Sequence, residues 1–195
     1  MLVDLAHANV QTAEAALKVT TRPVIISHTG LDTQLGRNPN MAGMMRPRLI
    51  GKEQAKTVAN AGGAVGVWTH LADTPLEYPQ NIRALVDVIG VEHVCIGTDT
   101  KLTQPGGGFG RGPGGPGGPG SGRGPDGGFG RGPGGGPGGG PGRAGERTNR
   151  AWQDQTARFY YVVVDAMLKT GFAPDEIGKI GGGNYLRLFG EAVKK

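Results

Sequence analysis

The sequence predicts an α/β fold in which four strand–helix units form a parallel sheet covered by helices. An eight-stranded (β/α) barrel has twice that number of units. Short apolar runs rich in β-branched residues alternate with longer segments of helical periodicity, which is typical of βα units. Each run ends next to polar side chains, as strands of barrel enzymes do at the edge that carries the chemistry. The expected strands cover residues 2–6, 24–27, 64–69 and 93–97.

Helical segments separate these strands. Asn9 can cap a first helix, and Pro23 ends any helical continuation before the second strand. A second helix is expected over about residues 52–60, because Gly62 and Gly63 follow it and glycine suits the left-handed C-terminal cap. The remaining helices are expected over residues 79–89, 151–169, 174–180 and 184–193.

A Gly/Pro-rich tract interrupts this pattern. Residues 105–142 contain 23 glycines and 8 prolines, and the nonapeptide GGFGRGPGG occurs twice within them. So few apolar side chains cannot offset the entropy of ordering the backbone, so we expect a disordered insertion over residues 105–145. It divides a single domain into a first part, residues 1–104, and C-terminal helices, residues 146–195.

The charge and hydropathy patterns exclude several classes of protein. The formal charge of +5 includes no long Lys/Arg run, so we expect no nucleic-acid surface. No stretch approaches the roughly 18 consecutive apolar residues of a transmembrane helix, and the first residues do not form a signal peptide. The chain begins inside an expected core strand, so we expect Met1 to be an internal methionine of a longer parent. The cellular compartment stays open.

Two histidines lie where expected strands end. His7 and His28 are 21 residues apart, about one strand–helix–strand step, which places them at the ends of adjacent parallel strands and facing one opening. Imidazole nitrogens at such positions suit zinc. A single histidine is more often a structural residue, but this pair at this spacing favours a metal site.

Six motifs are distributed over nearly all of the chain outside the Gly/Pro tract. They are VDLAH at residues 3–7, RPVIISHT at 22–29, RN at 37–38, GGAVGV at 62–67, VCIGTD at 94–99 and IGGGNYLR at 180–187. Together these motifs resemble the renal (membrane) dipeptidase family of zinc metallopeptidases. The resemblance implies a TIM-like (β/α) barrel of the metal-dependent hydrolase type, of which this chain matches about the last four βα units.

The resemblance also implies roles for individual residues. In that family two zinc ions activate a water and polarise the scissile carbonyl. His7 and His28 match the two histidines that bind one of these ions. Arg37 matches the arginine that holds the free carboxylate of the dipeptide, a task that suits the guanidinium fork. Asp99 matches an aspartate that contacts the substrate and the water and transfers a proton.

The chain departs from the family pattern in two ways. The family usually continues Asp-Phe-Asp-Gly where this chain reads Asp99, Thr100, Lys101, Leu102, so the loop that positions Asp99 is altered. A solvated or capping aspartate is the alternative for that position. The family's His-x-Asp pair, bridging glutamate and further histidine have no match here. Catalytic zinc generally needs three protein ligands, so we expect at most one partial zinc site.

The sequence thus leaves three functions to compare. The first is a zinc-dependent dipeptidase acting on small dipeptides, and the second is a catalytically inactive fragment or binding module. The third is an interaction protein that acts through its Gly/Pro tract. The expected partners are a dipeptide substrate and either a second copy of the chain or a missing N-terminal half. Of the other histidines, we expect His70 to be a pocket or loop residue and His93 to be structural.

Overall fold

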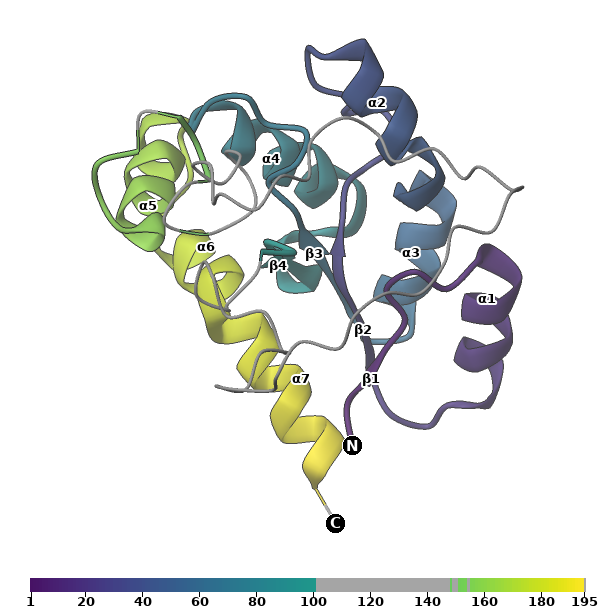
Figure 1. Cartoon of the computed structure of the whole chain (residues 1–195). Helices are drawn as coiled ribbons and strands as arrows, with labels where there is room; N and C mark the ends of the chain where they lie inside the picture. The colour runs from purple at the N-terminus through teal and green to yellow at the C-terminus, as the bar shows by residue number, and fades with distance from the viewer. Residues whose placement is uncertain (101–147, 149–150, 154, 195) are drawn as a thin grey trace, which may run out of the picture. The chain divides into compact units, whose positions relative to one another are not determined.

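A parallel four-stranded sheet forms the centre of the protein (Figure 1). The computed structural model describes residues 1–100, 148, 151–153 and 155–194. Strands that are neighbours in the sheet are also neighbours in the sequence, as in a (β/α) barrel, and the predicted α/β fold with a parallel sheet is confirmed. The strands are β1 (Val3–Asp4), β2 (Val24–Thr29), β3 (Ala64–Val67) and β4 (Val94–Ile96).

Three longer helices connect the strands, α1 (Val10–Val19), α3 (Lys52–Asn60) and α4 (Glu77–Ile89). Asn9 caps α1 as predicted, since its side-chain oxygen accepts a hydrogen bond from the Thr12 N–H at 2.8 Å. Helix α3 has the predicted bounds, and α4 begins two residues earlier than predicted.

The main core lies between one face of the sheet and these helices. Burial of each apolar side chain there contributes roughly 1.5–3 kcal/mol relative to exposure. This packing fixes the position of each strand along its own axis relative to the helix that covers it. It therefore also fixes where each strand ends. Among the fully buried contributors are Val24, Val58, Val65, Tyr78, Ile82, Leu85 and Val94.

The C-terminal helices follow as α5 (Phe159–Lys169), α6 (Pro174–Gly178), a π-helical turn η4 (Lys179–Gly183) and α7 (Asn184–Val193). Helix α7 lies against the N-terminal ends of the strands. The Asn184 amide donates hydrogen bonds to the carbonyls of Val91 and Val94, at 2.7 and 2.8 Å, and Leu188 packs with Ala64 and Cys95. Helix α7 therefore covers the end of the sheet opposite to the one where chemistry is expected.

The prediction of a helix over residues 151–169 was wrong in its first part, because α5 begins at Phe159. The Gln155 side chain forms hydrogen bonds with backbone groups that would bond to one another in a helix. It accepts from the Ala151 N–H at 3.0 Å and donates to the carbonyls of Thr148 and Ala157 at 2.8 and 3.0 Å. Trp152 is buried against Tyr78 and Phe159, which stabilises this irregular segment.

A helical segment absent from the sequence prediction joins β2 to α3. It comprises α2 (Pro39–Met45) and the 3-10 turn η1 (Arg46–Arg48). The Asn38 side chain accepts from the N–H groups of Asn40 and Met41, and Pro39 occupies the first turn. An asparagine followed by proline is a recognised helix start, so the sequence did contain the signal.

The predicted Gly/Pro-rich insertion over residues 105–145 lies outside the described residues, so the domain boundaries stay a prediction. Residues 1–100 and the described residues from 148 onward belong to the same compact unit. Within that unit, no helix has both the length and the apolar character needed to cross a membrane.

Candidate metal centre

Four titratable side chains meet at the carboxyl ends of the four strands. His7 follows β1, His28 belongs to β2, His70 follows β3 and Asp99 follows β4. The Nε2 atoms of His7 and His28 are 2.9 Å apart. Nε2 of His28 lies 3.7 Å from Oδ1 of Asp99, and Nε2 of His70 lies 3.2 Å from Oδ2 of Asp99. The side chains thus form one continuous row.

An irregularity in β2 places His28 in this row. Two residues, Ser27 and His28, lie between Ile26 and Thr29, whereas only one lies between their partners Val65 and Val67. Strand β2 therefore carries one extra residue at this point. Such a β-bulge changes the direction of the side chains that follow it.

Two glycines make room for the bulge. A Cβ on Gly66 would lie 2.1 Å from the Ser27 carbonyl oxygen, and a Cβ on Gly97 would lie 1.9 Å from the same atom. Any side chain at either position would collide with the backbone of the bulge. The glycines of β3 and of the residue after β4 therefore permit the conformation that presents His28.

His7 and Asp99 both have left-handed backbone conformations, with φ of 63° and 49°. This region is uncommon for residues other than glycine and costs about 1–3 kcal/mol. No other described non-glycine residue has positive φ. The residues that follow the two outer strands of the sheet, His7 after β1 and Asp99 after β4, thus both have this uncommon backbone conformation.

A hydrogen-bond chain supports His28 from behind. The Ser27 hydroxyl lies 2.9 Å from Nδ1 of His28, and Oδ1 of Asp4 accepts from the N–H groups of Ser27 and Ala6 at 3.0 and 2.9 Å. Burial raises the pKa of Asp4, but hydrogen bonds from the Ser27 side chain and from both N–H groups outweigh it, so the pKa lies below its ordinary value.

The Trp68 indole packs beside two rings of the row. Its centroid is 5.1 Å from that of His70 and 6.4 Å from that of His28. Trp68 itself is only 1% exposed. A buried indole cannot move far, so it restricts the orientations of both imidazoles.

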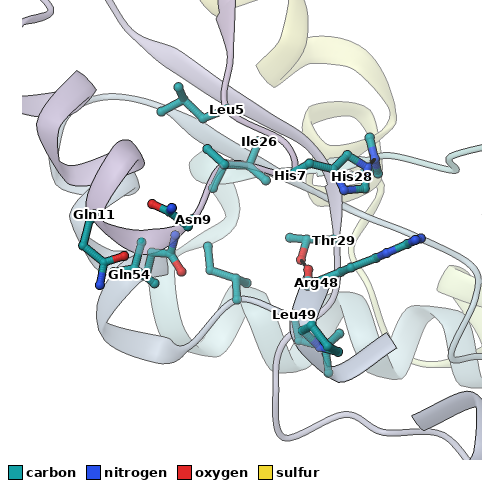
Figure 2. A pocket seen from close by; sticks show the side chains of 14 residues that line it. Leu5, His7, Asn9, Gln11, Ile26, His28, Thr29, Arg48, Leu49 and Gln54 are labelled. Carbon is teal, nitrogen blue, oxygen red and sulfur yellow. Dashed lines mark hydrogen bonds between the residues drawn. The ribbon is translucent and has the colours of Figure 1, made fainter. Parts of the chain in front are cut away.

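A pocket of about 380 Å³ opens beside the histidines. Figure 2 shows His7 and His28 together at one end of it and the polar side chains Asn9, Gln11 and Gln54 at the other. The Arg48 side chain also lines the pocket and runs toward the histidine end. The pocket therefore combines imidazoles, amides and one cation.

The predicted site residues are not all gathered here. His7, His28 and Asp99 lie together, but Arg37 pairs with Glu77 at the start of α4, and its side chain is 75% exposed. None of its described contacts reaches the row. The sequence analysis expected His70 to be a pocket or loop residue without naming it among the site residues, and it did not single out Arg48. A polar residue at a strand end was the available signal for His70, and the sequence pattern held none for Arg48.

The paired histidines fit a zinc ion as two of its ligands. Two nitrogens bound to one tetrahedral zinc lie about 3.3 Å apart, so the Nε2 atoms need to separate by only a few tenths of an ångström. In the described part of the chain, no group of three His, Cys, Asp or Glu side chains is placed to hold a metal ion. These residues therefore supply fewer than the three protein ligands that catalytic zinc generally has.

A family model and several solved structures match this chain. The model for membrane dipeptidases, peptidase family M19, matches residues 1–107. An amidohydrolase from Pseudomonas aeruginosa superposes with a TM-score of 0.63 at 18% identity, covering 98% of this chain and 52% of its own. Among curated proteins, none matches the chain significantly.

Two further structures agree on the fold. A metallopeptidase from Rhodobacter sphaeroides, liganded with a phosphinate mimic of the dipeptide L-Ala-D-Ala, gives a TM-score of 0.61 at 14% identity, covering 96% of this chain and 41% of its own. The dipeptidase AC, a metallopeptidase of family M19, gives 0.60 at 15% identity, with coverages of 96% and 42%. The chain thus spans about half the length of these neighbours, in agreement with the predicted partial barrel.

The family match covers the strands that end at His7 and His28, α2 to α4, and the strand that leads to Asp99. It therefore includes every residue of the row described above, and the neighbours share the arrangement of strands and helices. The chain belongs to the membrane dipeptidase family, peptidase family M19.

Proposed function

We propose that this chain carries part of the active centre of a zinc-dependent dipeptidase. In this proposal His7 and His28 bind one zinc ion, and Asp99 transfers a proton in the hydrolysis of a dipeptide. The observation that carries the proposal is the 2.9 Å approach of the two Nε2 atoms, with the Asp99 carboxylate 3.7 Å from one of them. Family membership and the dipeptide mimic bound to one structural neighbour support the substrate class.

Zinc, when bound, lowers the pKa of a water and polarises the scissile carbonyl. The chain's own residues then have separate tasks. Both imidazoles must be neutral and must present the Nε2 lone pair. Asp99 has Oδ1 on the side of His28, where it can accept a proton from the attacking water and return it to the leaving amine. Oδ2 is occupied by His70.

Two arginines are candidates for the carboxylate of the dipeptide. Arg37 matches the family's carboxylate-binding arginine. To bind the dipeptide, its guanidinium must release Glu77 and pair with the substrate carboxylate instead. Arg48 already lines the pocket that contains both histidines. We propose Arg37 as the carboxylate ligand and Arg48 as the second candidate. Arg37→Ala should raise KM while zinc content stays normal. If Arg48→Ala gives this result and Arg37→Ala does not, Arg48 is the residue that binds the substrate carboxylate.

The second candidate function is a catalytically inactive binding module. It is favoured by one observation, namely that the described residues provide no group of three metal ligands. Under either function the sheet has two edge strands in the described part, β1 and β4, which can pair with further strands. We therefore propose that a second copy of the chain or an N-terminal half-barrel binds there, and that only the half-barrel supplies the remaining ligands.

The test is a hydrolysis assay with a simple dipeptide such as L-Ala-D-Ala. The 195-residue chain is assayed alone and after mixing with an N-terminal half from a family member, each with zinc. The dipeptidase proposal expects no turnover by the chain alone and zinc-dependent turnover by the mixture, lost on His7→Ala. Failure of the mixture to turn over, although the two parts bind each other, would favour the inactive binding module.

A further inference from the structure

The pocket beside the two histidines contains one cation, Arg48. Its side chain lines the pocket and runs toward the end where His7 and His28 lie, as Figure 2 shows. The residue is exposed, and no carboxylate of the described residues pairs with its guanidinium. An arginine in this situation has its N–H groups available to an anionic group of a ligand.

The backbone that carries Arg48 is anchored to the end of β2. The buried Thr29 hydroxyl, in the residue directly after His28, donates a hydrogen bond to the Arg48 carbonyl at 2.7 Å. Two residues further along, the Ile50 N–H donates to the Gly30 carbonyl at 2.9 Å. The guanidinium therefore extends from a backbone segment that is fixed beside the proposed metal ligands, although the side chain itself is exposed.

No negative charge balances this cation within the pocket. No aspartate or glutamate of the described residues lines it, and apart from the two histidines Arg48 is the only lining side chain that titrates. Asn9, Gln11 and Gln54, at the opposite end, carry neutral carboxamides. Helices α1 and α3 begin at that end, and the N-terminus of a helix has a positive partial charge. The charges around the pocket therefore favour an anion.

We infer that this pocket takes the side chain of one residue of the dipeptide, and that Arg48 selects an acidic side chain there, glutamate or aspartate. The inference rests on the proposed function for the bond that is cleaved, whereas the preference of the pocket for an acidic group does not require hydrolysis. Arg37 remains the proposed ligand of the main-chain carboxylate, so Arg48 has a separate task. The pocket volume of about 380 Å³ lies within the usual range of small-ligand sites.

The contribution of Arg48 can be separated from that of pocket shape. Glutamate, glutamine and methionine side chains have nearly the same shape, but only glutamate carries a charge that pairs with a guanidinium. The apolar lining, which includes Leu5, Ile26 and Ile50, treats their shared aliphatic part alike. A charged hydrogen bond corresponds to roughly a ten- to hundredfold gain in affinity. Because solvent screens an exposed pair, we expect the lower end, about tenfold.

The experiment is a binding titration of the metal-free, full 195-residue chain, followed by ¹H–¹⁵N NMR of the backbone and of the arginine Nε–H groups. The ligands are L-Ala-L-Glu, L-Ala-L-Gln and L-Ala-L-Met, with the three peptides of reversed order. In one of the two orders we expect the glutamate dipeptide to bind about tenfold more tightly than its isosteres, with shift changes at Arg48. Equal affinities in both orders, or no saturable binding, would overturn the inference.

Variants then assign the preference to Arg48. Arg48→Gln should lower the affinity for the glutamate dipeptide to that of its isosteres and leave the affinities of the isosteres unchanged. Arg48→Glu should reverse the preference, so that a lysine dipeptide binds more tightly than the glutamate dipeptide. Arg46→Gln is the matched control, because it removes the same charge two residues away in η1 and does not line the pocket.

The pattern of loss in Arg48→Gln is decisive. An equal loss of affinity for the glutamate, glutamine and methionine dipeptides would show that Arg48 binds the main-chain carboxylate, and it would overturn the inference. An equal loss for the glutamate dipeptide in Arg46→Gln would also overturn it, because the preference would then reflect net charge alone.

Hydrolysis by the chain mixed with the N-terminal half separates this inference from the proposed function. If acidic dipeptides bind preferentially through Arg48 but no dipeptide is hydrolysed, the proposed function fails and the side-chain preference stands. If hydrolysis occurs and depends on His7, but the glutamate, glutamine and methionine substrates have equal kcat/KM, the proposed function stands and the inference fails.

Discussion

Nε2 of His70 donates a hydrogen bond to Oδ2 of Asp99 across 3.2 Å, between the ends of the neighbouring strands β3 and β4. Because Oδ2 is occupied in this way, Oδ1 faces His28 at 3.7 Å. The bond therefore selects which oxygen of the proposed proton carrier is free. Trp68 packs beside the ring of His70 and limits the rotation of this ring, which donates the bond.

Substituting His70 should affect the reaction without removing the metal. With the barrel completed by an N-terminal half, His70→Ala frees the Asp99 carboxylate to rotate, so we expect kcat to fall about tenfold or more, as for other outer-shell partners. KM and zinc content should change little. His70→Gln, which keeps an N–H donor, should recover part of the rate. Loss of zinc in His70→Ala would instead show that His70 binds metal.

The two glycines beside the bulge should not tolerate a methyl group. Gly66→Ala and Gly97→Ala each place a Cβ within about 2 Å of the Ser27 carbonyl oxygen, so the backbone must shift. We expect each to lower the free energy of unfolding by at least about 3 kcal/mol, measured by urea denaturation. Gly43→Ala is the control, since a Cβ there meets nothing within 4 Å and the position is helical. Gly97→Ala with wild-type stability would contradict the assigned bulge geometry.

An ion pair between helices should make stability depend on pH. Glu176 in α6 accepts two hydrogen bonds from Arg83 of α4, at 3.0 and 3.1 Å, and these bonds, with one from the Ala173 N–H, lower the pKa of Glu176. A carboxyl group whose pKa is lowered by folding stabilises the protein above its unfolded pKa. That contribution is lost as the pH falls through the folded pKa. Asp4, whose pKa is also lowered, contributes with the same sign.

We therefore expect the free energy of unfolding of the wild type to decrease below about pH 4, the ordinary range of carboxyl groups. Glu176→Gln should be less stable at pH 7 and should lose part of this pH dependence. Asp165→Asn is a matched control, because its partner Lys169 lies four residues away on the same exposed helix surface and such pairs contribute little. Denaturation of the three proteins between pH 3 and 7 checks this, and parallel curves for Glu176→Gln and wild type would contradict it.

The positions of the strand ends were predictable from the sequence for a physical reason. In a parallel βα unit the apolar run and its helix must pack together, so the residue after the run lies at a known edge of the sheet. This reasoning placed His7, His28 and Asp99 at one edge, where the structure has them. Their roles as ligands and proton carrier stay proposals.

The contacts that depend on tertiary packing were not predictable. The Arg37–Glu77 pair joins residues forty positions apart, and nothing in the local pattern of either indicates the other. The bulge at Ser27 leaves no periodicity signal, because the apolar run before it, residues 24–26, shows no alternation that one extra residue could shift. The helix predicted from residue 151 failed because one side chain, Gln155, pairs the backbone groups differently.

The most direct test of the central claim is zinc binding by the 195-residue chain, measured by calorimetric titration. We predict one weakly bound zinc ion per chain, lost in His7→Ala and in His28→Ala. It should be retained in His93→Gln, whose native ring contacts the Gly63 carbonyl at the opposite end of the sheet. Zinc that stays bound to the double variant His7→Ala, His28→Ala, or that is lost equally in His93→Gln, would contradict the assignment of these two histidines as the metal ligands.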